Sequence, residues 1–190
     1  KEVYFLDPVR PIGTGEQPGL LLQYFGEGAA AQMEQALEKL QEHKSLVLDL
    51  RDNSGGSMEE LLGVADLFLD AGSVVLQRQT GGQVEVSMVE SERAWDGNVV
   101  VLVNRGTKGL AEVLAGALQE HRAATLVGTR TGGVATADSF HDIGAGLVLK
   151  LTDSELRLPS GRTWAGTGLE PDVFVESIEL SLPGSKRRAP

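Results

Sequence analysis

The segment Leu48-Asp49-Leu50-Arg51-Asp52-Asn53-Ser54-Gly55-Gly56 decides the fold that this sequence predicts. Its first residues complete an apolar run, Ser45 to Arg51, of the kind found in strands buried on both faces. Its last residues, Asp52 to Gly56, are a strong turn signal. Ser57 and Glu60 follow with the spacing of a capping box, which predicts a helix to about Leu69. Strand, turn and helix in this order indicate an α/β domain.

The same alternation continues on both sides of this segment. Upstream, Leu20 to Tyr24 predicts a strand and Ala29 to His43 an amphipathic helix. Downstream, the pattern predicts a hairpin, a buried strand, a helix and a fourth core strand, over Ser73 to Gln79 with Gln83 to Val89, Asn98 to Asn104, Thr107 to Glu120, and Ala124 to Gly128. Gly144 to Glu176 predicts β-hairpins, with turns at Asp153-Ser154 and Pro159 to Arg162. We therefore expect one α/β domain with a largely parallel sheet.

Composition excludes several classes of function. The chain has 17 Lys and Arg against 27 Asp and Glu, and its formal net charge of −10 argues against nucleic acid as a partner. It has no cysteine, so disulfides, thiolate catalysis and cysteine-based zinc sites are excluded. Three scattered histidines give little support for a metal site, and no motif predicts a cofactor. The longest apolar runs, such as Val99 to Val103, are too short to span a membrane.

The two ends of the chain differ from its centre. Residues 1–12 predict a single strand, which the loop-like stretch Gly13 to Gly19 separates from the rest. Residues 183–190 include Lys186-Arg187-Arg188 between Pro, Gly and Ser, which predicts a flexible basic tail. The expected core is residues 19–182.

Four motifs, in this order along the chain, resemble those of the C-terminal processing (tail-specific) serine peptidases. They are the opening segment, Val101 to Thr107 with Glu112 to Leu118, Ala124 to Thr131, and Leu158 to Arg162 with Gly166 to Asp172. The resemblance spans roughly Gly19 to Glu176. It implies a Clp protease/crotonase-like superhelix of ββα units, and it implies that residues 1–12 are the trailing strand of an upstream PDZ-like domain. It also implies an exported protein, in the periplasm or cell envelope.

The resemblance implies a Ser-Lys dyad, from which this sequence departs at each polar position. The nucleophile position is Gly109, in Thr107-Lys108-Gly109-Leu110, where the family has small residues and Ser. The base position is Val134, in Gly132-Gly133-Val134-Ala135, where the family reads Phe-Gly-Lys-Gly. The Gln that often orients the Lys falls at Asp138. Because glycine has no side chain and valine cannot accept a proton, we expect three vestigial positions and no peptidase activity.

Backbone donors for an oxyanion can survive such losses. By resemblance these donors are the N–H groups of Gly55 and Leu110. The alternative is that Asn53 to Gly56 form only a tight turn that caps a helix, and the sequence favours neither interpretation. Glu112 matches a glutamate of the family, although the sequence identifies no partner for it.

Two other constellations contain catalytic residue types. Thr107 and Lys108 flank the lost position, but adjacent helix residues point about 100° apart. Ser139, His141 and Asp142 include the residue types of a triad, but on a strand Asp142 faces away from the other two. A surface hairpin is the better interpretation of these three.

The sequence therefore predicts a non-catalytic relative, a pseudoprotease, that binds a peptide or a protein C-terminus, by strand addition beside the vacant site. The alternatives are an active serine-type endopeptidase with displaced catalytic residues, an acyl-thioester enzyme that uses a crotonase-like oxyanion hole, and a purely architectural domain. The oligomeric state is not indicated.

Overall fold

The computed structural model of the chain describes residues 7–13, 17–144 and 146–176, and the side chains of these residues except 139 and 140. In chain order its elements are β1 (Val9–Gly13), β2 (Pro18–Leu22), α1 (Ala29–Glu38), β3 (Ser45–Asp49), α2 (Met58–Asp66), β4 (Gly72–Gln79), β5 (Val84–Val89), β6 (Asn98–Val103), α3 (Leu110–Glu120), β7 (Ala124–Gly128), β8 (Thr136–Gly144), β9 (Leu147–Arg157) and β10 (Val173–Phe174).

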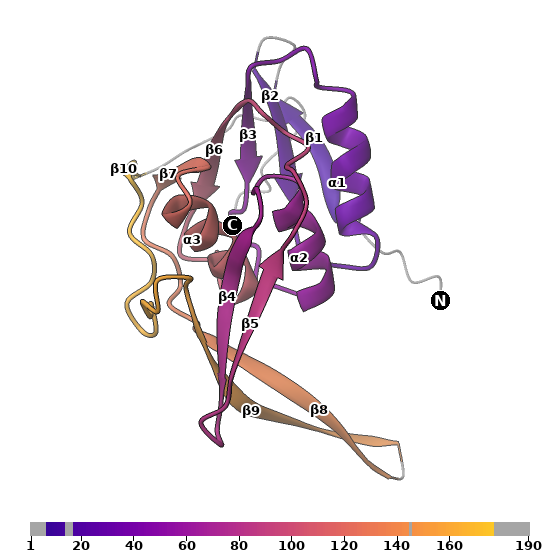
Figure 1. The fold of residues 1–190 in the computed structure, drawn as a ribbon, viewed down its shortest axis with the longest axis vertical. Coiled ribbons are helices and arrows are strands. Elements are labelled where there is room, and N and C mark those ends of the chain that lie inside the picture. Colours follow the sequence, from indigo (N-terminus) through magenta and orange to yellow (C-terminus); the bar gives the residue numbers. More distant parts are fainter. Residues whose placement is uncertain (1–6, 14–16, 145, 177–190) are drawn as a thin grey trace, which may run out of the picture.

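The larger sheet has six strands in the order β1-β2-β3-β6-β7-β10 (Figure 1). All neighbouring strands from β2 to β10 run parallel, and β1 pairs antiparallel with β2 at the edge. Because the parallel strands follow one another in one direction across the sheet, right-handed crossovers place their helices on one face. The largely parallel sheet expected from the sequence is confirmed.

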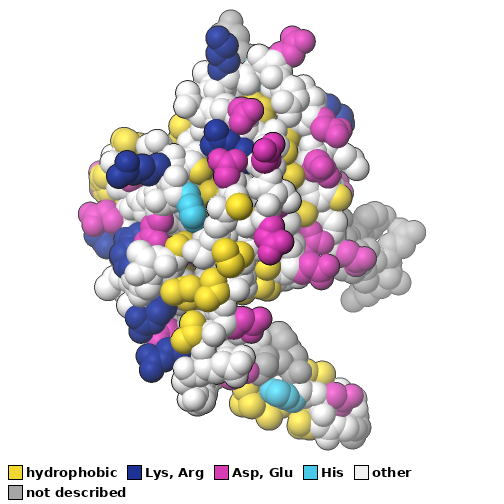
Figure 2. All heavy atoms as spheres, in the orientation of Figure 1, with side chains coloured by type: hydrophobic (Ala, Val, Ile, Leu, Met, Phe, Trp, Pro, Cys, Tyr) yellow, Lys and Arg dark blue, Asp and Glu magenta, His cyan; other side chains and the backbone are white. Residues whose placement is uncertain are grey.

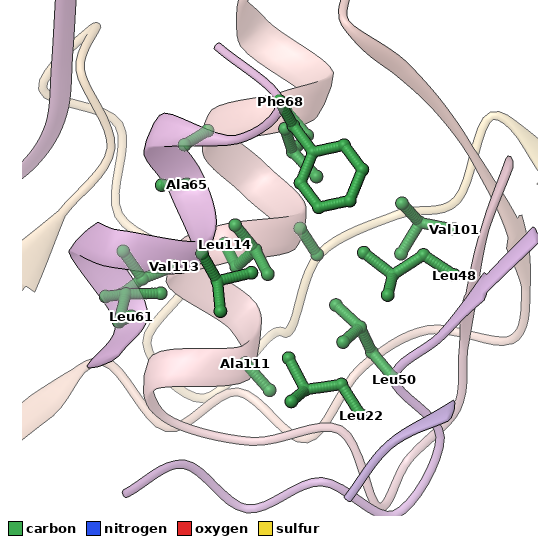
Figure 3. Close-up of a cluster of buried hydrophobic side chains, with 14 of the residues drawn as sticks. Leu22, Leu48, Leu50, Leu61, Ala65, Phe68, Val101, Ala111, Val113 and Leu114 are labelled. Carbon is green, nitrogen blue, oxygen red and sulfur yellow. The ribbon is translucent and has the colours of Figure 1, made fainter. Parts of the chain in front are cut away.

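A dry core joins this sheet to α2 and α3. Figure 3 shows Leu61 and Ala65 of α2 beside Val113 of α3, with Phe68 just after α2. The strands contribute alternate residues, among them Leu46 and Leu48, while Val47 between them is only half-buried. Burying a side chain of this size stabilises the fold by about 1.5–3 kcal/mol, so these contacts hold α2 and α3 against the sheet.

The second sheet is antiparallel, with the strand order β5-β4-β9-β8. The β4–β5 hairpin lies where the sequence predicts it. The β8–β9 hairpin extends away from the body of the molecule (Figure 1). The parallel sheet, its helices and these β units together form the expected Clp protease/crotonase-like superhelix.

The Asp153-Ser154 pair does not form the turn that the sequence predicts. Strand β9 runs straight through it, and the pairing with β8 shifts register because Ala137 lies opposite Ser154 while Asp138 lies opposite Thr152. Asp153 is therefore the extra residue of a β-bulge. The prediction was wrong because the same short polar residues favour both tight turns and bulges.

The predicted capping box of Ser57 and Glu60 is also wrong. Ser57 is the N-cap residue of α2, but its side chain makes no capping hydrogen bond. The Glu60 carboxylate instead accepts hydrogen bonds from the N–H groups of Gly28, at 2.7 Å, and Ala30, at 2.9 Å. The N-cap of α1 is Gly28, which has no side chain to satisfy these donors. Glu60 therefore caps the neighbouring helix.

The boundaries of other elements differ modestly from the predicted ones. Helix α3 begins at Leu110 rather than Thr107, because Gly109 has φ 57° and ψ −122°, outside the helical region. Helix α1 ends at Glu38, before the predicted His43. Val9–Gly13 is the described part of the predicted first strand, and its origin in a PDZ-like domain stays a prediction. The predicted basic tail lies outside the described residues.

Replacing Glu60 tests the capping of α1. Because Glu60→Ala leaves two helix N–H groups without an acceptor, we expect the free energy of unfolding to fall by about 1–2 kcal/mol. Urea unfolding followed by circular dichroism measures the change. Glu59→Ala removes an exposed glutamate from the same helical turn and should change stability by less than about 0.5 kcal/mol. Equal losses for the two variants would contradict the capping role.

Candidate functional site

The candidate site lies at the carboxyl ends of the parallel strands. The turn after β3 carries Gly55, the turn after β6 leads into α3, and the loop after β7 carries Val134. Carboxyl ends of neighbouring parallel strands meet at one edge of a sheet, where binding sites of α/β proteins commonly form. The three loops are tied together by hydrogen bonds from the Lys108 N–H to the Asn53 carbonyl and from the Gly132 N–H to the Thr107 carbonyl, both 2.9 Å.

Gly109 is the buried N-cap residue of α3. Its positive φ lies in the region that favours glycine, and a side chain there stores strain of about 1–3 kcal/mol. Space is not the obstacle, because the first atom that an added Cβ would meet is the Ser54 carbonyl oxygen at 3.4 Å. The backbone therefore leaves room for a short side chain at this position.

Glu112 connects the start of α3 with the loop after β7. Its side chain is fully buried, and its Oε2 accepts hydrogen bonds from the N–H groups of Gly109, at 3.1 Å, and Val134, at 2.8 Å. Its Oε1 accepts one from the Gly133 N–H, at 2.8 Å, and one from the Thr131 hydroxyl. Positions 109 and 134 thus lie on either side of one carboxylate oxygen.

The sequence identified Glu112 but not its partners. The signal was available, because Glu112 is the third residue after the N-cap, from which a glutamate reaches back to the N-cap N–H. A charged residue in a helix otherwise buried from Ala111 to Leu118 also needs internal hydrogen bonds. The loop that supplies the other donors lies 19 to 22 residues further along the chain, beyond the reach of local patterns.

Val134 is 40% exposed and bonds to Glu112 through its backbone only. Asp138 lies four residues further on, in β8, and its side chain pairs with β9 rather than with the loop. Its carboxylate accepts hydrogen bonds from the Lys150 ammonium, at 2.8 Å, and the Thr152 hydroxyl, at 2.5 Å. The structure thus brings positions 109 and 134 together and directs Asp138 into a cross-strand pair.

Gly55 and Leu110 are neighbours, as an oxyanion hole requires. A Cβ on Gly55 would lie 3.3 Å from the Leu110 nitrogen. The Gly55 N–H, however, donates to the Asn53 side-chain oxygen at 2.9 Å, and the Asn53 amide nitrogen donates to the Leu22 carbonyl. Among the described residues the Leu110 N–H has no acceptor. One donor of the expected pair is available and the other is engaged in a turn, so the oxyanion hole stays a prediction.

The flanking hydroxyl of Thr107 is committed to the fold. It is fully buried and donates to the Leu50 carbonyl at 2.8 Å, while accepting from the Asn104 N–H at 3.1 Å. Asp142, from the other constellation, accepts a hydrogen bond from the Gly144 N–H in the β8–β9 turn. The Ser139 side chain lies outside the described residues. The Thr107 hydroxyl is therefore unavailable as a nucleophile while the Leu50 carbonyl holds it.

Two cavities lie near the sheet without touching positions 109 or 134. One, of about 360 Å³, is lined by Asp49, Arg51 and Asn104 among others. Arg51 donates two side-chain hydrogen bonds to Asp49, at 2.9 and 2.6 Å, and the hydrogen bond with Asp49 raises the pKa of Arg51. The other, of about 500 Å³, lies between α1 and the β1–β2 edge. Arg51 and Asp49 form a structural pair at the end of β3.

In residues 7–13, 17–144 and 146–176, no three His, Asp or Glu side chains gather where they could hold a metal ion. None of the helices in these ranges has both the length and the apolar sequence needed to cross a membrane.

Comparison with known proteins assigns this architecture to a class. Residues 20–175 match the sequence pattern of "Peptidase family S41". The carboxyl-terminal-processing protease of Synechocystis sp. is 34% identical over 180 residues, which are 93% of this chain and 42% of that protein. The carboxy-terminal-processing protease of Bartonella bacilliformis is 32% identical over 165 residues, which are 83% of this chain and 38% of that protein.

The solved structure of a photosystem II D1 C-terminal processing protease superposes with a TM-score of 0.82 at 28% identity, over 91% of this chain and 49% of that one. Fold, loop order and sequence together define a core of the serine-type C-terminal processing proteases. The chain belongs to peptidase family S41. It spans less than half the length of the two curated relatives.

Removing the Glu112 carboxyl tests its role as the connection between the two loops. Because Glu112→Ala leaves three N–H groups and a hydroxyl without their acceptor, we expect a loss of about 3 kcal/mol or more in unfolding free energy. At temperatures where the variant is folded, amide hydrogen exchange at Gly133 and Val134 should accelerate more than exchange in β6. Glu34→Ala, which removes an exposed glutamate from α1, is the control. Unchanged exchange in the 131–134 loop would refute the connection.

The pH dependence of Asp138 tests its cross-strand pair. Hydrogen bonds from Lys150 and Thr152, together with the charge of Lys150, hold the pKa of the Asp138 carboxyl below its ordinary value of about 3.9. A lowered pKa means that the pair stabilises the fold above the unfolded-state pKa and loses this effect as the pH falls through the folded pKa.

Carboxyl chemical shifts measured by NMR across pH 2–6 report this titration. Lys150→Met should move the midpoint of Asp138 upward, toward the ordinary value. Lys44→Met removes a lysine just before β3, outside the β8–β9 hairpin, and should leave the midpoint of Asp138 unchanged. A midpoint that Lys150→Met leaves unchanged would show that the pair is not formed in solution.

Proposed function

We propose that this chain is a non-catalytic member of its family, a pseudoprotease that binds a peptide or protein C-terminus without cleaving it. The observation that carries this proposal is that the N–H groups of Gly109 and Val134 both donate to one oxygen of the Glu112 carboxylate. The scaffold of a dyad is retained, while neither position has a group that can attack or accept a proton.

Peptide hydrolysis by a hydroxyl requires a nucleophile, a base and a donor for the developing oxyanion. At this site the Leu110 N–H remains as a donor. The Thr107 hydroxyl is occupied by the Leu50 carbonyl, and its movement would leave that buried carbonyl unpaired. This commitment argues against the alternative of a peptidase with displaced catalytic groups.

Exposed apolar strands support the binding part of the proposal. On the projecting β8–β9 hairpin, Leu149 and Leu151 are 42% and 45% exposed, and Figure 2 shows hydrophobic side chains on this hairpin. Strands β5 and β8 are the edges of their sheet, so an extended peptide has unpaired backbone groups to join. By family resemblance, we place this function in the periplasm or cell envelope.

The purified protein should be inert. We expect no hydrolysis of peptides and no covalent labelling of a serine or threonine by a fluorophosphonate, because Gly109 and Val134 supply neither a nucleophile nor a base. Intact-protein mass spectrometry measures the labelling. A stoichiometric adduct that maps to this chain would overturn the proposal.

Restoring the two groups tests whether the scaffold is otherwise intact. Gly109→Ser combined with Val134→Lys should gain fluorophosphonate labelling and slow hydrolysis, because the substituted side chains start on either side of one carboxylate oxygen. Residual catalysis without a dyad reaches only about 10³–10⁴ over water in the serine-protease precedent. Gly109→Ala with Val134→Lys carries comparable backbone strain without the nucleophile and should stay inert. A folded Ser and Lys variant without labelling would contradict the retained geometry.

A further inference from the structure

Lys108 lies across the loop that carries Val134. Its side-chain carbons occupy the space beside Gly132, where an added Cβ would be 2.4 Å from the Lys108 Cγ and 3.0 Å from its Cε. No side chain at position 132 fits while Lys108 holds this place. The aliphatic stem of Lys108 therefore packs against the Gly132 backbone, in the manner of lysines that bury their stem and keep the ammonium in water.

The backbone fixes this direction. The Lys108 N–H donates to the Asn53 carbonyl at 2.9 Å, and its carbonyl accepts from the Ala111 N–H at 3.1 Å. Its neighbours Thr107 and Gly109 are both buried, while Lys108 itself is exposed. A side chain that starts from such a constrained position has few routes into solvent, and the observed route follows the site loop.

None of the ion pairs in the part of the chain that the structure describes includes the Lys108 ammonium. Two acids near Lys108 in the sequence or beside its backbone partner Asn53 have other hydrogen-bond partners. Glu112 is buried and accepts four hydrogen bonds, and Asp52 accepts one from the Asn104 amide at 3.1 Å. In a chain of net charge −10, this is an unpaired cation at the site itself.

We propose that Lys108 binds a carboxylate of the bound peptide, either its C-terminal carboxylate or an acidic side chain. This inference rests on the proposed function and names the chemistry of the ligand. The stem packs against Gly132, in the loop that also carries Val134, so that the anion is recognised beside this loop. Positions 108 and 132 both depart from the family motifs, with a larger and a smaller residue respectively, as expected if the stem fills the space that Gly132 leaves.

A pool of synthetic ten-residue peptides tests the proposal on the intact chain. The pool contains free-acid and C-terminally amidated peptides, each with and without one internal glutamate, and mass spectrometry measures the retention of each on the immobilised protein. We expect enrichment of peptides that carry a carboxylate at low salt, and weaker enrichment at high salt because exposed charges are screened. Enrichment of free acids identifies the terminus, and enrichment of amidated glutamate peptides identifies the side chain.

Two variants and a control isolate Lys108. Lys108→Met keeps the stem and removes the charge, and Gly132→Ala displaces the stem; each should reduce the carboxylate preference by about two- to fivefold. Lys44→Met changes the net charge equally at the opposite end of the strands and should leave the preference intact.

The two proposals fail in different ways. Peptides retained without regard to carboxylates, or equally by the folded Lys108→Met variant, would overturn the role of Lys108 while peptide binding stands. Retention of no peptide by the unmodified protein would overturn peptide binding and the role of Lys108 with it.

Discussion

The site depends on the buried carboxyl of Glu112. Its two oxygens accept hydrogen bonds from the start of α3 and from three residues of the 131–134 loop, Thr131, Gly133 and Val134. A carboxylate removed from water is costly unless such donors replace its hydration. Helix and loop must therefore stay in this arrangement as long as the chain is folded, whichever side chains stand at positions 109 and 134.

Because of this dependence, the backbone arrangement of the site does not require catalytic side chains at positions 109 and 134. In a dyad the reacting oxygen and amine belong to side chains, whereas the connection made by Glu112 involves backbone groups at 109, 133 and 134. Substituting Gly and Val at the two side-chain positions leaves every one of these hydrogen bonds in place. Under the proposed function, loss of activity and loss of structure are therefore uncoupled at this site, and binding persists without catalysis.

Sequence reasoning succeeded where the pattern is local and repetitive. Continuous apolar runs identified the parallel strands, and the strand Ala124–Gly128 was predicted with its observed bounds. It failed where one short polar residue has several possible partners. Glu60 has the spacing of a cap for its own helix, but its carboxylate accepts the N–H groups at the start of α1, where the N-cap Gly28 has no side chain. Asp153 is a residue type that favours turns, but β9 continues through it in its pairing with β8, and Asp153 forms a β-bulge.

The candidate site was predictable as positions but not as interactions. Motif order located Gly109 and Val134, and the structure brings them to one carboxylate. The Gly55 N–H donates to Asn53, and the Lys108 stem packs against Gly132. These interactions form where the loops after three different strands meet. No periodicity within one segment encodes such contacts, so sequence alone could not supply them.

The most direct test of the retained scaffold is a crystal structure of the protein with serine at position 109 and lysine at position 134. If Glu112 holds the two loops as described, the serine Oγ and the lysine Nζ should lie within hydrogen-bond reach, about 2.6–3.2 Å, or be bridged by one water. Side chains that point into separate regions, with the Glu112 hydrogen bonds intact, would contradict the account.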